Sequence, residues 1–154
     1  MANNLEIVPY KEIYSNFFYI LNAAWLKKYF YIEPYDEKVL SDPKKYILDS
    51  GGFIFFALYN SEVVGVVSLI KQNDFYELSK MAVDSKFQGL KIGHGLVKHC
   101  ISFGRQKGWK NIILYSHRSL ETAIYLYKKL GFIEIPLEKE VPYGRANIKM
   151  EITL

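Results

Sequence analysis

The hydrophobic residues of this chain change their spacing partway along it. Three runs of β-branched and aromatic residues, at 53–59, 63–71 and 75–83, are separated only by short turn segments, which is typical of consecutive strands. From residue 93 to residue 107 the apolar positions instead recur at helical spacing, and Gly108 follows the last of them. A chain of this kind packs helices against a sheet, which excludes an all-helical fold and a β-sandwich.

The flanking segments continue the alternation of strands and helices. Ser119 suits the cap of one further helix and Pro43 the first turn of another. No internal repeat or flexible linker interrupts the pattern, so the sequence predicts a single α/β or α+β domain over residues 1–154 with a mixed sheet. The further strands are expected at 5–8, 111–116 and 147–153, and the further helices at 11–29, 43–48 and 119–130.

Charge is distributed unevenly between the two halves of the chain. The 154 residues have a formal net charge of +4, but residues 1–79 hold 7 basic and 10 acidic side chains, whereas residues 80–154 hold 13 basic and 6 acidic ones. We therefore expect an anionic partner to bind the second half. Because the basic residues are spread over strands, loop and helix rather than gathered in one run, nucleic-acid binding is the weaker interpretation and is not expected.

Several protein classes are excluded by composition. A single cysteine, Cys100, allows neither an intrachain disulfide nor a cysteine-based metal site, and its helical pattern favours a buried hydrophobe over a nucleophile. The three histidines share no ligand spacing with carboxylates, so no metal is expected. No apolar run approaches the ~18 residues of a membrane span and the N-terminus lacks a signal-peptide pattern, so we expect a cytoplasmic protein with no membrane partner.

The segment between the third central strand and the next helix has the composition of an anion site. Glycines at positions 89, 93 and 95 let phosphate oxygens approach the backbone, and the first turn of a helix offers unpaired N–H groups. Lys86 and Lys91 add positive charge. The P-loop pattern is absent, and G-x-G-x-x-G fails because position 98 is lysine. The residue pattern alone leaves two alternatives, a phosphate site or a tight turn that uses glycine.

Two motifs in this half resemble those of one enzyme superfamily. The QGLKIG stretch at 88–93 is similar to the Q/R-x-x-G-x-G/A acyl-CoA signature of the GNAT superfamily, the acetyl-CoA-dependent N-acetyltransferases. Residues 123–132 are similar to the A-I-x-L-Y-x-K-x-G-F helix of the same superfamily. The sequence departs from the family pattern at Lys91, where the signature has its first glycine, and at Leu120, where many members have a cofactor-contacting asparagine. The resemblance implies a GNAT-like mixed, mostly antiparallel sheet of about six to seven strands flanked by about four helices.

The resemblance also implies that acetyl-CoA binds as the acetyl donor. In the superfamily, the end of the strand before the signature pairs with pantetheine, and the signature loop and helix hold the pyrophosphate. The residues at the matching positions, expected to bind the cofactor, are Met81, Ala82, Val83, Gln88, Gly89, Leu90, Lys91, Ile92, Gly93 and His94.

Acetylation of an amine benefits from a general base and a general acid. Glu77 lies six residues before Val83, with the strand alternation expected to place it on the face of Met81 and Val83, and it resembles the glutamate base of several members, acting directly or through water. The alternative is a solvated strand glutamate. Tyr127 matches the family tyrosine that protonates the thiolate of coenzyme A, and the alternative is a core aromatic. A backbone N–H near residues 81–83 is expected to hold the oxyanion.

The acceptor side is less defined by sequence. The resemblance implies a primary amine, on a small molecule or a peptide, that attacks directly in a ternary complex, and homodimers are common among relatives. Aromatic and acidic residues gather at 29–37, in the region that forms part of the acceptor channel in the family, and they suit a cationic amine; a solvated loop is the alternative. His117 follows a strand and is a further candidate for this site. A non-catalytic acyl-CoA-binding module on the same fold is the competing function.

Overall fold

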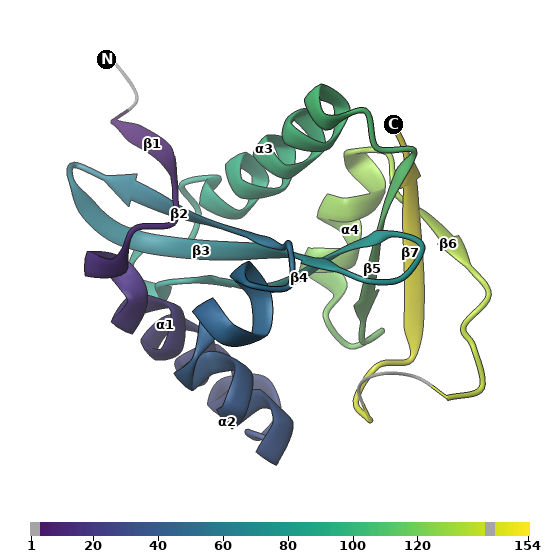
Figure 1. The fold of residues 1–154 in the computed structure, drawn as a ribbon, viewed down its shortest axis with the longest axis horizontal. Coiled ribbons are helices and arrows are strands. Elements are labelled where there is room, and N and C mark those ends of the chain that lie inside the picture. Colours follow the sequence, from purple (N-terminus) through teal and green to yellow (C-terminus); the bar gives the residue numbers. More distant parts are fainter. Residues whose placement is uncertain (1–3, 141–143) are drawn as a thin grey trace.

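A seven-stranded sheet with the order β1-β2-β3-β4-β5-β7-β6 forms the centre of the molecule (Figure 1). The computed structural model describes residues 4–140 and 144–154. The strands are β1 (Leu5–Pro9), β2 (Phe53–Tyr59), β3 (Glu62–Lys71), β4 (Tyr76–Val83), β5 (Asn111–Ser116), β6 (Ile133–Ile135) and β7 (Ile148–Thr153). The α-helices of the described residues are α1 (Ser15–Tyr29), α2 (Pro34–Ser41), α3 (Ile92–Lys107) and α4 (Glu121–Lys129), and the short helical segments are η1 (Glu12–Tyr14), η2 (Lys44–Leu48) and η3 (Ser85–Phe87).

Helices cover both faces of the sheet and create two hydrophobic cores (Figure 1). Side chains alternate along a strand, so Ile54 and Phe56 of β2 face the core beneath α1 and α2, whereas Phe55 and Ala57 face the core beneath α3 and α4. Because both faces are covered, the central strands are almost continuously apolar. This packing holds β4 rigidly in the middle of the sheet.

The sheet opens between β4 and β5. These two strands run parallel and are connected through α3, whereas every other neighbouring pair is antiparallel. Their register pairs residues 76–78 with residues 112–114 only, although β4 continues to Val83 and β5 to Ser116. The strands therefore separate at their carboxyl ends, which is where open sheets of this type bind ligands.

A bulge interrupts β4 just where this opening begins. Ser79 pairs with Ser68 and Ala82 with Val66, so three steps along β4 oppose two along β3. The extra residue lies at Lys80, whose backbone is left-handed with φ of 54°. The Ser68 hydroxyl donates to the Ser79 carbonyl at 2.8 Å and stabilises the strand beside the bulge.

The bulge reverses the alternation of side chains along β4. Leu78 lies before it and Met81 and Val83 lie after it, yet all three pack toward the core beneath α3 and α4. Glu77, the neighbour of Leu78, therefore lies on the opposite face, where Ala82 packs beneath α1 and α2. The expectation that Glu77 shares a face with Met81 and Val83 is wrong.

The remaining elements agree closely with the pattern of the sequence. The predicted strands and helices are present with ends within two residues, except that the helix expected over 11–29 is divided into η1 and α1. The sequence missed α2 and the short β6. The expected cap at Ser119 is wrong, because α4 begins after Leu120 without a side-chain cap and the Ser119 hydroxyl lies 2.7 Å from His117 Nδ1 instead.

Candidate active site

A groove of about 590 Å³ lies where the end of β4, the first turn of α3 and one side of α4 meet. Its lining combines hydrophobic side chains with polar groups from the loop before α3 and from the first turn of that helix. The lining residues are Trp25, Tyr29, Met81, Val83, Phe87, Gln88, Gly89, Lys91, Ile92, Gly93, His94, Ser119, Leu120, Glu121, Thr122, Ala123, Tyr125, Leu126 and Lys129.

The N-terminus of α3 opens onto this groove. Lys91 is its N-cap and is left-handed, with φ of 60°, a conformation that favours glycine. Because the first N–H groups of a helix have no partner within it, those of Ile92, Gly93 and His94 are available at this end, whereas the Gly95 N–H donates to the Lys91 carbonyl at 3.0 Å. The end of this 16-residue helix therefore offers donors and a partial positive charge to an anion.

Cationic side chains surround the same helix end. Burial and the positive charges of Lys98, Lys129 and Lys91 together lower the pKa of His94. Among the lining residues that the structure describes, Glu121 is the single acid. The rim therefore suits a ligand that carries phosphate groups.

A smaller cavity of about 130 Å³ adjoins the groove in the opening between β4 and β5. Trp25, Met81, Leu120 and Ala123 line both spaces. The other residues of the inner cavity are Asn22, Leu26, Phe30, Leu78, Ser79, Lys80, Leu114, Tyr115, Ser116, His117, Tyr127, Arg145 and Ala146. The two spaces thus lie side by side, with four residues between them.

Tyr127 reaches the inner cavity from α4. Its ring is 8% exposed and packs against Phe132 with 5.9 Å between the ring centroids. Its hydroxyl makes no hydrogen bond with any residue that the structure describes. Burial raises the pKa of Tyr127 to about 12, so the phenol keeps its proton at neutral pH and can donate it.

Glu77, the second predicted catalytic residue, is buried but lines neither space. It is 1% exposed, and Gln72 Nε2 donates to its Oε1 at 3.0 Å. Its neighbours on β4, Leu78 and Ser79, line the inner cavity. Exchange of a proton between this carboxylate and the cavity therefore needs an intervening group.

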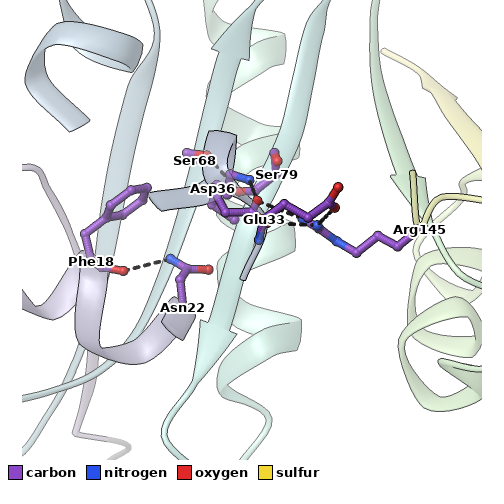
Figure 2. A network of polar contacts seen from close by, with 8 residues as sticks. Phe18, Asn22, Glu33, Asp36, Ser68, Ser79 and Arg145 are labelled. Carbon is purple, nitrogen blue, oxygen red and sulfur yellow. Dashed lines mark hydrogen bonds and ion pairs between the residues drawn. The ribbon is translucent and has the colours of Figure 1, made fainter. Parts of the chain in front are cut away.

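A buried ion-pair network forms one wall of the inner cavity (Figure 2). Asp36 of α2 accepts hydrogen bonds at 3.0 Å from Lys80 Nζ and from both terminal nitrogens of Arg145, and Arg145 also donates to Glu33 at 2.6 Å. Burial raises the pKa of Asp36, but the hydrogen bond from Arg145 and the charge of Lys80 outweigh burial and hold that pKa below its ordinary value. The side chains of Lys80 and Asp36 are only 5% and 2% exposed, so the network is rigid.

The groove gathers eight of the ten residues predicted to bind the cofactor. Met81, Val83, Gln88, Gly89, Lys91, Ile92, Gly93 and His94 line it. Ala82 instead packs beneath α1 and α2, and Leu90 is exposed on the loop. Any contact of these last two with a ligand in the groove must come from their backbones.

The aromatic and acidic segment at 29–37 differs from its expected role. Tyr31 and Tyr35 are exposed, whereas Phe30 lines the inner cavity together with His117. Glu33 and Asp36 are engaged by cations and do not line that cavity. The expectation that their carboxylates receive a cationic amine is therefore wrong.

The sequence interpretation missed both basic side chains, Lys80 and Arg145, among the described residues that line the inner cavity. Pro34 was a partial indication of α2, because proline favours the first turn of a helix. Asp36 follows two positions later in that turn. Nothing in the local sequence marks Lys80 as a bulge residue or Arg145 as its neighbour in space.

Residues 4–140 and 144–154 contain no evident site for metal binding or for catalysis by a cysteine. No cluster of three or more His, Cys, Asp or Glu side chains could hold a metal ion there. Cys100 is fully buried, and burial raises the pKa of its thiol. In the same ranges, no helix combines the length and the apolar character that crossing a bilayer requires.

The sequence is similar to known acetyltransferases. A family model described as "Acetyltransferase (GNAT) family" matches residues 13–132. An uncharacterised N-acetyltransferase of Dictyostelium discoideum is 38% identical over 79 residues, which are 47% of this chain and 37% of that protein. The chain therefore matches well under half of the length of this relative.

The fold is similar to those of solved acetyltransferases over almost the whole chain. A GNAT-family acetyltransferase from Staphylococcus aureus Mu50 superposes with a TM-score of 0.84 and 26% identity, covering 97% of this chain and 98% of the other. The PaiA N-acetyltransferase from Thermoplasma acidophilum, solved in complex with coenzyme A, has a TM-score of 0.75 and 21% identity over the full length of both chains. At 21% identity, the similarity to the PaiA structure establishes a shared fold.

Proposed function

Since the chain belongs to the GNAT acetyltransferase family, whose model matches residues 13–132, we propose that it transfers the acetyl group of acetyl-CoA to a primary amine. The observation that carries this proposal is that a groove suited to phosphates adjoins an inner cavity lined by Tyr127, with four residues lining both spaces. Two adjacent spaces suit a donor and an acceptor that bind together, with direct attack by the amine in a ternary complex.

Coenzyme A fits the donor set of the groove. The N–H groups of Ile92, Gly93 and His94, together with the Lys91 side chain, are suited to hold the pyrophosphate. The register pairs no residue of β4 beyond Leu78 with β5, so the end of β4 is suited to pair with the amide groups of pantetheine. When bound, acetyl-CoA supplies an activated acyl group and a thiolate leaving group.

Tyr127 is assigned the general-acid role. Its protonated hydroxyl lies in the cavity that the acceptor enters, and donation of that proton neutralises the departing thiolate. Glu77 is assigned the base role through an intervening water, because its carboxylate does not line the cavity. The backbone N–H groups near residues 81–83 are assigned to the oxyanion. With Cys100 buried, no acyl-enzyme intermediate is invoked.

Calorimetry with acetyl-CoA tests donor binding, and thiol release with a broad amine panel tests transfer. We expect binding at micromolar acetyl-CoA and amine-dependent release of free coenzyme A. Absence of binding at high micromolar concentrations would overturn the proposal. Binding without thiol release for any amine would instead establish a non-catalytic acyl-CoA-binding module.

A further inference from the structure

The inner cavity has an unusual charge distribution for a site that receives an amine. Lys80 and Arg145 line it, and no carboxylate is present among its described lining residues. The rest of its wall is largely apolar or aromatic, with Trp25, Leu26 and Phe30 contributed by α1 and the residue after it. An ammonium group entering this cavity meets cations and apolar surfaces.

The two cations are held in place by buried contacts. Asp36 bridges them, with 3.0 Å from its Oδ1 to Lys80 Nζ and to one terminal nitrogen of Arg145 (Figure 2). The backbone of Lys80 is left-handed, a conformation that is unfavourable for a non-glycine residue, and such strain concentrates at functional sites. Both side chains are thus preorganised at the cavity wall before any ligand binds.

The surrounding acids do not remove this asymmetry. Glu33 contacts Arg145, and Glu77 interacts electrostatically with Lys80, but neither lines the cavity. Of these charged groups, Lys80 and Arg145 are the ones that line the cavity. The planar guanidinium of Arg145 is suited to charge-assisted hydrogen bonds with a carboxylate.

We infer that the amine acceptor carries its own carboxylate, close to the reacting amine, on an apolar or aromatic body. This inference rests on the proposed acetyl transfer and names its acceptor class as amino acids and their close analogues. Arg145, with Lys80 beside it, binds the carboxylate, while Trp25 and Phe30 contact the apolar body. A cavity of about 130 Å³ favours acceptors in which few bonds separate the carboxylate from the amine. A polyamine, whose second ammonium group meets Lys80 and Arg145, is disfavoured.

Matched acceptors measure this preference in the unmodified protein. Phenylalanine, phenylalaninamide, 2-phenylethylamine and spermidine are compared by kcat/KM for thiol release at saturating acetyl-CoA. The amide has the less basic amine and so the larger neutral fraction at pH 7.5, which means that a preference for the acid arises from its carboxylate. We expect phenylalanine to exceed each of the other three by about tenfold or more.

Substitution of Arg145 tests whether its guanidinium causes the preference for an acceptor with a carboxylate. In Arg145→Gln, the ratio of kcat/KM for phenylalanine to that for phenylalaninamide is expected to fall to about one. Arg118→Gln is the matched control, because Arg118 is exposed, pairs with Glu134 and lines neither space. Its ratio is expected to equal that of the unmodified protein.

A carboxylate ligand gives a readout that is independent of turnover. By calorimetry, 3-phenylpropionate should bind the unmodified protein at least about tenfold more tightly than 3-phenylpropanol, and Arg145→Gln should abolish the difference. Equal binding of the two, faster turnover of spermidine or 2-phenylethylamine, or an unchanged ratio in a folded Arg145→Gln would overturn the inference. Failure of every amine to release thiol would contradict the proposed transfer, and the calorimetric comparison would still decide the carboxylate site.

Discussion

The Tyr127 phenol lies at the inner cavity and has a raised pKa. It makes no hydrogen bond with any described residue. Tyr127→Phe removes this hydroxyl and keeps the ring against Phe132, so the free energy of unfolding should change by less than about 0.5 kcal/mol. Loss of the acid should lower kcat about 100-fold, while the Kd for acetyl-CoA stays unchanged. Thiol-release kinetics and calorimetry measure the two quantities. Tyr35→Phe, at an exposed site on α2, is the control, and an unchanged kcat in Tyr127→Phe would exclude the acid role.

Glu77 is the proposed base, and its replacement affects the pH dependence of the reaction. In Glu77→Gln the acceptor amine must lose its proton without help, so activity depends on the fraction of amine that is already neutral. The rising limb of kcat/KM should move to higher pH, and the rate at pH 7 should fall by about 10- to 100-fold. Glu62→Gln, at the exposed first residue of β3, should leave the profile in place. A profile that does not move in Glu77→Gln would reject the base role.

At the level of residues, the sequence predicted what local motifs encode and missed what depends on distant partners. Gly93 and Tyr127 occupy motif positions, and the structure places Gly93 at the groove and Tyr127 at the inner cavity. Asp36, Lys80 and Arg145 escaped because the ion pairs join positions 44 and 109 residues apart, with no local pattern to connect them. The bulge at Lys80 could not be predicted either, because no local residue pattern indicates a left-handed lysine.

At the level of elements, the first turn of α3 lies at the groove, and Gly93 in that turn leaves space for a ligand to approach the backbone. A methyl group on Gly93 would lie 3.9 Å from Val83 and 3.9 Å from Leu126, which is ordinary packing distance, but it would project between two walls of the groove. Gly93→Ala should therefore fold normally and raise the Kd for coenzyme A by about tenfold. Calorimetry measures the change.

A neighbouring glycine provides the control for this experiment. Gly95→Ala makes the same change two positions later, where the new methyl meets the flexible Leu5 side chain at 3.2 Å and not the groove. Its Kd for coenzyme A should match that of the unmodified protein. Equal affinity in the two variants would show that the first turn does not approach the ligand closely.

Hydrophobic periodicity predicted long elements well and short ones poorly. The central strands and α3 contain enough apolar residues to define their period. In α2, only Asp36, Val39 and Leu40 are buried among eight residues, so its period is hard to separate from that of a loop. The predicted side-chain alternation of β4 was also wrong beyond the bulge, because one inserted residue moves every later side chain to the opposite face of the sheet.

At the level of the whole molecule, the Asp36 network connects three distant parts of the chain: α2, the centre of β4 and the segment before β7. Asp36→Asn leaves the buried Lys80 and the half-buried Arg145 without their shared carboxylate and should lower the free energy of unfolding at pH 7 by about 3 kcal/mol. Urea denaturation measures the change. Asp49→Asn, in an exposed pair with Lys44, should cost less than about 0.5 kcal/mol.

Acid adds a second readout for the same variant. Because the folded protein holds the pKa of Asp36 below its ordinary 3.8, the stabilisation is complete above that value and is lost as pH falls through the lower folded pKa. The unmodified protein should therefore lose stability below about pH 4, and Asp36→Asn should lack this part of the loss. Parallel acid profiles for the two proteins would show that the network contributes nothing to this dependence.

The opposite charges of the two halves of the sequence have a more specific meaning in the fold. Lys91 and Lys129, from the basic half, line the groove proposed for coenzyme A. Glu33 and Asp36, from the acidic half, do not face the acceptor but hold Arg145 at its cavity. The charge of the basic half thus agrees with the donor side that we propose, whereas pairing between the halves leaves Glu33 and Asp36 away from the proposed acceptor cavity.

The four side chains common to both compartments restrict how this protein can acquire a new acceptor. A change at Trp25, Met81, Leu120 or Ala123 alters the space for both substrates, so a variant selected for a new amine there also alters its use of the donor. Phe30 borders the inner compartment alone. Acceptor range should therefore diversify, in evolution or in a designed library, through positions such as Phe30, while the shared wall stays fixed.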